Sequence, residues 1–546
     1  MQNLHRKKCG TDSQKSHPLT PGLSRWLGFV AGLWAAWAAS AGFCAETSDP
    51  LLDLMLKKGL ITQDEAARVK AEAEALQTNV STMPPMESKW KINRAIKSVE
   101  LFGDIRLRFE DREAIAPDNT KIEDQRGRYA VRLGLRGDAF NDFYYGFRLD
   151  TAANPRSPWV TFGTSSGSAA PYNGPFGKSA AGLNIGQVYL GWRPEQWLDV
   201  TVGKMPMPLY TTAMVWDSDF NPEGAAERFK YTVGEADFFG TFGQFLYSDV
   251  NPSFASPGFG FNNALGGLGQ KGSTVFQLAW QGGLNYHLTT NLSAKIAATL
   301  YNYIGVQSNN LSPFFGDSFV GQGAYLGPGS ADGYVGDSGY SSGAVTPYQS
   351  LGFANNQVGL NHLMVVEVPF EVNLKLRKVD VRVFGDFAYN LDGKKRAEDA
   401  QASYAYFLAN SQQFPATIRP FGSQTKEVKA YQLGVSVASS GNVGMVYGSV
   451  CKRNGWEIRG YWQHVEQYAL DPNLLDSDFF EGRGNLQGFY SAIAYGFSDN
   501  VLATVRYGYA SRINNNLGTG GSNQDIPQMN PIGNFRLLQM DLTFRF

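Results

Sequence analysis

The chain has 546 residues, enough for several ordinary domains or for one large barrel with a small appendage. Charged residues make up only 18% of it, below the roughly 25% usual in soluble proteins, whereas Phe, Tyr and Gly are abundant. The formal net charge of -1 argues against nucleic acid as a partner, because a phosphate-binding surface needs a basic excess. Beyond the N-terminus no stretch offers the ~20 apolar residues of a membrane helix, so composition fits a transmembrane β-barrel and a large soluble all-β protein equally well.

Residues 1–45 are expected to be a signal peptide for export. Basic residues precede an apolar run over 26–39, and small residues follow it. Cleavage is predicted after Ala41 or Ala45. A single membrane anchor is the alternative, but the run is short and ends in a cleavage-like site. Of the three cysteines only Cys451 certainly remains after cleavage, so no internal disulfide is expected.

Residues 46–98 are predicted to form a short periplasmic helical segment and a linker. Apolar residues cluster over 51–56, and Thr62-Gln-Asp-Glu65 is a capping box that opens a second helix through Leu76. Two prolines at 84–85 end the unit. Its role could be periplasmic spacing, trimer contact or cell-wall contact, or it could be an accessory hairpin without a ligand.

Residues 99–546 are predicted to form an all-β transmembrane antiparallel β-barrel of the outer membrane. Apolar and polar residues alternate in runs such as 105–109, 128–136 and 366–376. Such alternation places one face of each strand in an apolar medium and the other face in a polar one. A soluble β-sandwich would also alternate, but with fewer arginines and shorter strands.

The connections between these strands alternate in length. Short polar turns are predicted at 137–142, 193–196, 234–235, 287–291, 377–378 and 498–500. Long loops are predicted at roughly 110–125, 152–182, 205–224, 249–271, 305–356, 391–424, 468–484 and 512–533. This asymmetry is typical of outer-membrane barrels, whose turns are periplasmic and whose loops lie outside. The count is about 16 strands, and the exception is 438–454, where a short turn is expected and the chain is longer.

The last strand carries the sharpest single signal. Apolar residues occupy every second position from Leu538, and the chain ends on Phe544-Arg-Phe546. A ladder that ends in a terminal aromatic resembles the signal read by the bacterial barrel-assembly machinery, which is therefore an expected partner beside the lipid of the outer membrane.

Three segments together resemble the putative porin family of Gram-negative bacteria. They are 182–192, then Leu198-Asp-Val-Thr-Val-Gly-Lys-Met-Pro206, then Val215-Trp-Asp-Ser-Asp-Phe-Asn-Pro-Glu-Gly224. That family's hallmark is a strand ending in Gly-Lys, a Pro-containing link and the Trp-Asp-x-Asp-x-Asn-Pro-Glu-Gly motif. The resemblance implies a passive diffusion channel for small hydrophilic solutes and ions, similar in plan to general and phosphate-selective porins. It also implies a homotrimer.

The alternation also assigns charges to the barrel wall. An arginine on the lipid face would cost ~2–4 kcal/mol at mid-membrane, so the arginines are expected to face inward. The basic wall predicted from the first three strands contains Arg106, Arg108, Arg128, Arg132, Arg136 and Arg148. The acidic wall predicted to face it contains Glu367, Glu371, Asp380 and Asp386. The alternative is that these are only solvated residues of the lumen.

The loop 205–224 is the candidate constriction. In trimeric porins of this plan the third outer loop narrows the lumen, and here it carries Asp217, Asp219 and Glu223. If the loop folds inward, an aqueous gap between these carboxylates and the arginines would hold a transverse field. The alternative is that Asp217 and Asp219 only cap local turns.

No catalytic, cofactor-binding or metal site is predicted. The five histidines have no metal-ligand spacing, and the G-x-G-x-x-G match at 267–272 lies in a Gly-rich loop before a strand. The chain is therefore not expected to be an enzyme. The competing functions are an adhesin or cell-wall tether with an incidental pore and, less favoured, a barrel-embedded hydrolase.

The C-terminal ladder leads to a first prediction. Deleting Phe546, or replacing it by Asp, should reduce outer-membrane insertion and leave the chain in the periplasm, because an open sheet edge cannot persist in lipid. Fractionation and surface labelling measure the outcome. A mutant that reaches wild-type surface levels would contradict the assignment of Phe546 as an assembly signal.

Overall fold

The computed structural model describes one strand-rich body and very little before it. The described residues are 58, 95–117, 119–152, 157–163, 182–248, 275–304, 363–398, 427–471, 474–515, 517, 519 and 532–546. Contacts divide the chain into a unit of residues 1–91 and a unit of residues 92–546. The predicted signal peptide, nearly all of the helical segment, and most of the loops 152–182, 249–271, 305–356, 391–424 and 512–533 therefore lie outside the described residues. Among the described residues no helix is long and apolar enough to cross a membrane.

Strands make up nearly all of the described part of the second unit. In chain order they are β1 (Glu100–Ile115), β2 (Lys121–Asp138), β3 (Phe143–Ala152), β4 (Val160–Thr161), β5 (Gly182–Glu195), β6 (Leu198–Lys204), β7 (Glu223–Val233), β8 (Ala236–Ser248), β9 (Val275–Thr289), β10 (Leu292–Ile304), β11 (Met364–Lys375), β12 (Val379–Asn390), β13 (Lys429–Ser439), β14 (Trp456–Val465), β15 (Leu486–Gly496), β16 (Val501–Arg512) and β17 (Asn534–Arg545). β4 is a two-residue piece beside β2, and the other sixteen form the predicted barrel.

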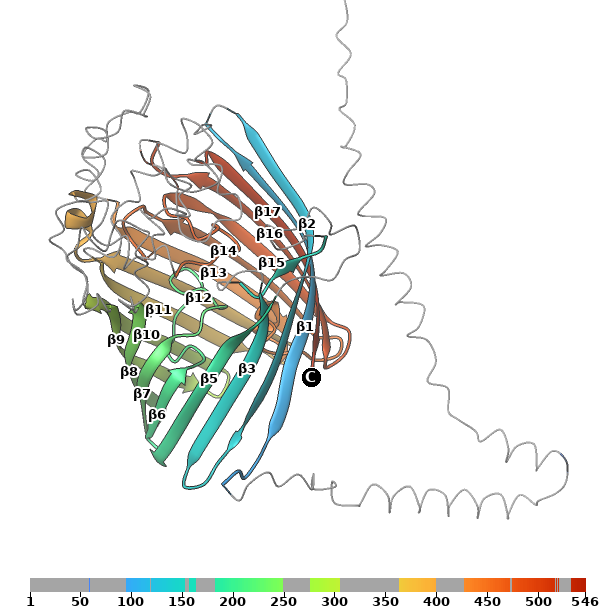
Figure 1. Cartoon of the computed structure of the whole chain (residues 1–546), viewed down its shortest axis with the longest axis vertical. Helices are drawn as coiled ribbons and strands as arrows, with labels where there is room; N and C mark the ends of the chain where they lie inside the picture. The colour runs from blue at the N-terminus through green and yellow to red at the C-terminus, as the bar shows by residue number, and fades with distance from the viewer. Residues whose placement is uncertain are drawn as a thin grey trace, which may run out of the picture. The chain divides into compact units, whose positions relative to one another are not determined.

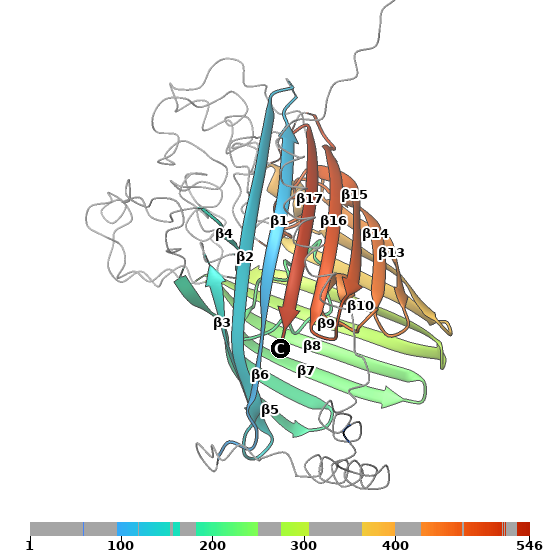
Figure 2. The same ribbon diagram turned by 90° about the vertical axis from the view of Figure 1, so that its right-hand side faces the viewer.

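The sheet closes on itself, because its first and last strands are hydrogen-bonded neighbours. Each long strand pairs antiparallel with the next, and β1 pairs with β17 over Asp104–Ile115 and Asn534–Arg545. Figure 2 shows β17 running beside β1 and β16 around the ring. Closure leaves no free sheet edge, which is the condition for strands to span a membrane.

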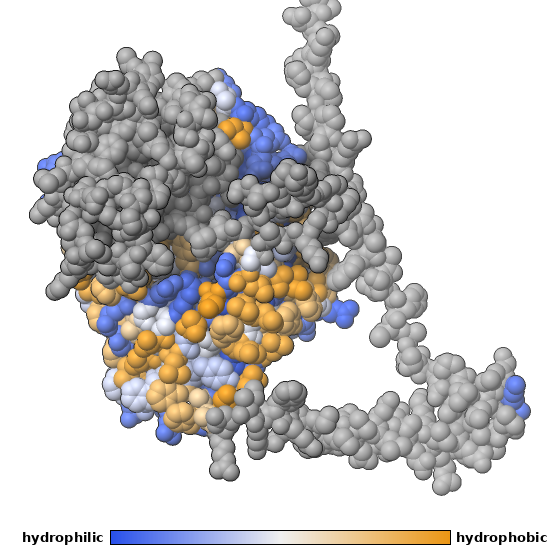
Figure 3. Space-filling view, in the orientation of Figure 1, coloured by the Kyte–Doolittle hydropathy of each residue, from blue (hydrophilic) through white to orange (hydrophobic). Residues whose placement is uncertain are grey.

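The two faces of the strands differ as the alternation predicts. On β1, Ile105 and Leu107 are exposed on the outer face, while Arg108 of the same strand is buried on the inner face. Figure 3 shows apolar residues gathered over the strand wall that faces the viewer. The terminal aromatics Phe544 and Phe546 are on the outer side, and the backbone of Phe546 pairs with Gly103. An apolar outer surface of this kind suits a lipid environment.

Two connections between strands differ from those predicted from the sequence. The predicted loop 110–125 is wrong in its bounds, because β1 and β2 stay paired up to Ile115 and Lys121. The outward residues of this paired end are polar, so the sequence resembles a loop. The two strands nevertheless remain paired, because a strand outside the apolar layer needs no apolar face. The long turn at 438–454 contains a 3-10 helix, Met445–Tyr447, whose start is held by Glu457 accepting from two backbone N–H groups. This turn accordingly packs against β14 and β15.

Candidate functional site

The connection between β6 and β7 leaves the barrel wall at a pair of glycines. Gly203 and Gly224 are partners in the β6–β7 register and have φ angles of 122° and 146°. An added Cβ would lie 2.3 Å from the carbonyl oxygen of Val188 at the first glycine and 2.1 Å from that of Gln244 at the second. Only glycine fits both the torsion and the space, and these are the glycines of the Gly-Lys and Pro-Glu-Gly motifs.

The connection, residues 205–222, then runs inside the barrel (Figure 1) and is held by the inner faces of several strands. At Tyr210 its backbone exchanges two 2.8 Å hydrogen bonds with the side chain of Gln281 on β9. Thr211 donates to Glu367 of β11 at 2.6 Å, and Thr212 donates to Asp386 of β12. We call residues 205–222 the inner loop.

The second half of the inner loop is anchored on the opposite side by the motif residues. Trp216 is buried and lies edge-on to Phe245 of β8. Asp219 pairs with Arg132 of β2, and Asn221 accepts from Gln187 of β5 at 2.8 Å. The motif thus supplies the side chains that attach the inner loop to β2, β5 and β8.

The loop 468–484, which the sequence predicts only as a long outer loop, also lies inside the barrel over its described residues 468–471 and 474–484. Phe479 is fully buried between Tyr461 of β14 and Tyr490 of β15, and Asp478 pairs with Arg108 of β1 at 2.9 Å. The available signal was its apolar content: Leu474-Leu475 and Phe479-Phe480 are unusual in a loop facing water. We call residues 468–484 the second inner loop.

The two inner loops contact each other directly. The backbone N–H of Asp217 donates to the carbonyl of Leu474 at 2.7 Å, and the N–H of Asp476 donates to the carbonyl of Ala213 at 3.3 Å. The Asp217 carboxylate accepts from the N–H of Ser477 at 3.0 Å. It also accepts from the N–H of Asp219, so it caps a local turn and joins the loops at once.

The six arginines predicted for the basic wall lie on β1–β3 and all have carboxylate partners. The pairs are Arg106 with Asp104 (2.7 Å), Arg108 with Asp541 (2.7 Å), Arg128 with Glu110 (3.2 Å), Arg132 with Asp219, Arg136 with Glu100 (2.7 Å) and Arg148 with Asp150 (2.7 Å). This wall is a network of ion pairs. Because Asp219 touches Arg132, the expected aqueous gap between these two groups is absent.

The four carboxylates predicted for the acidic wall are also engaged. Glu367 and Asp386 are buried beneath the inner loop and accept the two threonine hydroxyls. The other two are bound locally: Asp380 accepts from the N–H of Gly441 at 2.7 Å, and Glu371 pairs with Arg382. Glu223, at the start of β7, pairs with Lys204. The facing wall therefore presents less negative charge than its composition suggests.

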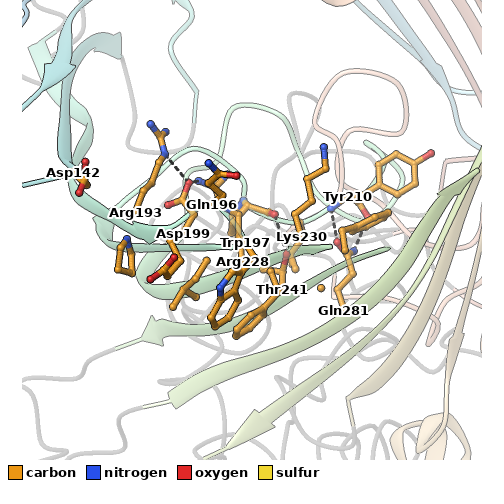
Figure 4. A pocket seen from close by; sticks show the side chains of 18 of the residues that line it. Asp142, Arg193, Gln196, Trp197, Asp199, Tyr210, Arg228, Lys230, Thr241 and Gln281 are labelled. Atoms are coloured by element: carbon orange, nitrogen blue, oxygen red, sulfur yellow. Dashed lines mark hydrogen bonds and ion pairs between the residues drawn. The ribbon is translucent and has the colours of Figure 1, made fainter. Parts of the chain in front are cut away.

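A cavity of about 790 Å³ lies between the inner loop and the wall of β5–β10, toward the short-turn end (Figure 4). Its basic side chains are Arg193, Arg228, Lys230 and Lys295, and its acidic ones are Asp142, Glu195 and Asp199. The ammonium group of Lys295 is 3.7 Å from the centre of the Tyr210 ring. The cavity thus combines ionised groups with aromatic rings of loop and wall.

Acidic groups at the contact between the inner loops have shifted pKa values. Burial, together with Asp219 and Asp476, raises the pKa of Asp217 well above its ordinary value. Burial and the neighbouring Asp478 raise the pKa of Asp476 to about 7. Asp478 differs: burial opposes its ionisation, but Arg108 and Arg112 hold its pKa below the ordinary value. The contact therefore favours protonated Asp217 and Asp476 beside an ionised Asp478.

Among the described residues no group of three or more His, Cys, Asp and Glu side chains could hold a metal ion. The ionised side chains are instead arranged along the inner wall and at the inner loops. Such an arrangement can order and select ions or polar solutes in water.

Comparisons with known proteins give one family match and several similar solved structures. The model of a family described as putative porin matches residues 68–546. No curated protein matches the chain. Solved structures to which it is similar include an anion-selective porin from Comamonas acidovorans (9% identity, TM-score 0.37, covering 82% of this chain and 99% of that one), OmpF from Salmonella typhi (8%, 0.40, 83% and 99%) and OmpT from Vibrio cholerae (10%, 0.34, 83% and 100%).

The threonine anchors give a second prediction. Thr211→Val combined with Thr212→Val removes hydroxyl donors to two buried carboxylates, each such bond being worth about 1.5–3 kcal/mol. The inner loop should loosen and uncover Glu367 and Asp386, raising channel conductance and moving ion preference toward cations. Planar-bilayer recording measures both, with Thr232→Val as a control away from the loop. Unchanged conductance and selectivity in the double variant would show that these bonds do not hold the loop.

The contact between the inner loops should depend on pH. Since the pKa of Asp476 is raised from 3.8 to about 7, its contribution to the contact is complete at acidic pH and is lost as pH rises through about 7. Above that range Asp476 is ionised beside Asp217 and Asp219, so the loops should separate and conductance noise should increase. Asp476→Asn should remove this change. Recordings at about pH 5 and about pH 9 test it, and equal pH dependence in both proteins would contradict it.

Proposed function

Because the chain belongs to the putative porin family, we propose that it forms a water-filled channel for passive diffusion of small hydrophilic solutes and ions. We infer from this membership that the chain lies in the outer membrane and acts as a channel protein, not as an enzyme. The observation that carries the proposal is the inner loop, which is anchored to opposite inner walls of a closed sixteen-strand barrel.

The chemistry of the two barrel faces supports a channel. Apolar side chains are exposed outside, and ionised or hydrogen-bonding side chains face inward on β1–β3 and β10–β12. A barrel built only as an anchor has no need of anchored loops across its interior. In a diffusion channel such loops set the width and the charge of the constriction. We assign that role to the two inner loops together, with Asp217 and Asp219 at their junction and Arg132 on the wall.

Assembly and export complete the proposal. We propose that the signal peptide directs the chain out of the cytoplasm, that the barrel-assembly machinery recognises Phe544 and Phe546, and that the channel is a homotrimer in outer-membrane lipid. The support is the terminal aromatic ladder, whose two rings lie 5.9 Å apart on the outer face at the β1–β17 seam. The short-turn end of the barrel would face the periplasm.

Single-channel recording tests this function. The purified, refolded protein in a planar bilayer should give discrete conductance steps that occur in groups of three, with a reversal potential in a salt gradient that reports ion preference. A barrel that inserts but does not conduct would contradict the porin assignment and favour an adhesin or tether. Steps that always occur singly would contradict the trimer but not the channel.

A further inference from the structure

Among the described residues, one buried arginine of the barrel interior has no carboxylate partner. Arg459 of β14 is only 4% exposed, and its Nε and Nη1 atoms are buried without a hydrogen-bond acceptor among the described residues. In contrast, the buried inward arginines of β1 and β2, such as Arg108 and Arg132, lie in ion pairs. Burying a charged group without a partner is unfavourable in free energy. The unpaired N–H groups of Arg459 can therefore bind an anion.

Aromatic rings surround this guanidinium. Its central carbon lies 3.8 Å from the ring centre of Phe384, 4.5 Å from that of Tyr447 and 5.7 Å from that of Tyr461. These rings come from β12, from the long 440–455 turn and from β14 itself. Cation–π contact stabilises the charge but leaves the N–H groups without acceptors. The rings also make the surroundings apolar.

The nearest carboxylate on the same strand is already used. Glu457, two residues before Arg459, accepts from the Ser436 hydroxyl and from the N–H groups of Gly444 and Val446. Arg382 of β12 lies in the same cross-strand row, because Ser436 of β13 is the register partner of both arginines. Arg382 pairs with Glu371, so this neighbouring carboxylate is engaged by a different arginine. Among the described residues the neighbouring carboxylates therefore have other partners, and none of them pairs with Arg459.

We propose that Arg459 is the centre of a solute-binding subsite on the inner wall of β12–β14 that takes a small organic carboxylate with a planar apolar body. The guanidinium would bind the carboxylate, and Phe384, Tyr447 and Tyr461 would contact the body. An apolar surround favours a singly charged anion over a strongly hydrated dianion such as phosphate, since less hydration is lost. Tyr447, which is 48% exposed, is the ring past which the solute enters. The subsite deepens the proposed channel function and rests on it.

The probe for this subsite is benzoate. Binding to the detergent-purified full chain is measured by saturation-transfer NMR, and block of single-channel current in potassium chloride is measured in parallel. Wild-type protein should show saturable binding and a saturable decrease in current. Arg459→Gln should weaken the apparent affinity about tenfold, the change expected for one lost charge-assisted contact. No carboxylate in the described part of the chain pairs with Arg459, so neutralising it leaves no described carboxylate without its partner.

A matched variant controls for the loss of one positive charge. Arg377→Gln removes an exposed arginine of the β11–β12 turn and should leave benzoate affinity unchanged. Tyr447→Ala alters only an exposed turn residue and should also weaken benzoate binding. This variant therefore tests the subsite even if Arg459→Gln does not fold. Equal affinities in wild type, Arg459→Gln and Tyr447→Ala would overturn the subsite. Phosphate binding more tightly than benzoate would overturn the proposed solute class.

The two measurements separate this inference from the channel itself. Arg459-dependent benzoate binding without any conductance would support the subsite and contradict the porin function. Conductance with no saturable benzoate binding would support the porin function and overturn the subsite.

Discussion

The pairing of β1 with β17 is the constraint on which the rest of this structure depends. In lipid every backbone N–H and C=O group must find a partner within the protein, so a sheet can span the membrane only when it has no edge. Twelve residue pairs join the two strands, and the ion pair of Arg108 with Asp541 crosses the same seam on the inside. Closure then creates an interior, and the second inner loop is attached to that seam through Asp478.

The interior charges act mainly as anchors for the two inner loops. Glu367 and Asp386 receive threonine hydroxyls, and Arg132 and Arg108 receive aspartates from the two loops. Each of these contacts removes a charge from the surface that a solute meets. The electrostatic potential in the lumen is consequently set by the ionised side chains that are not engaged by the inner loops. The total number of acidic and basic residues on each wall does not determine it.

The family motif can be understood in the same physical terms. Gly203 and Gly224 permit the chain to turn away from the wall, Asp219 fixes it to β2, and Asp217 fixes it to the second inner loop. The residues of the motif therefore serve to attach the inner loop to the inside of the barrel.

The sequence alone determined the barrel, because alternation with a period of two, as in Ile105–Phe109, directly reports which face of a strand meets lipid. It also located the inner loop, through its motif. It did not reveal that Asp219 touches Arg132, that Glu367 binds Thr211, or that residues 468–484 lie inside. These contacts join residues from distant parts of the chain, and no local pattern encodes them. Only closure of the barrel brings such residues together. The tertiary structure therefore decided which charges are paired and which, like Arg459, have no carboxylate partner among the described residues.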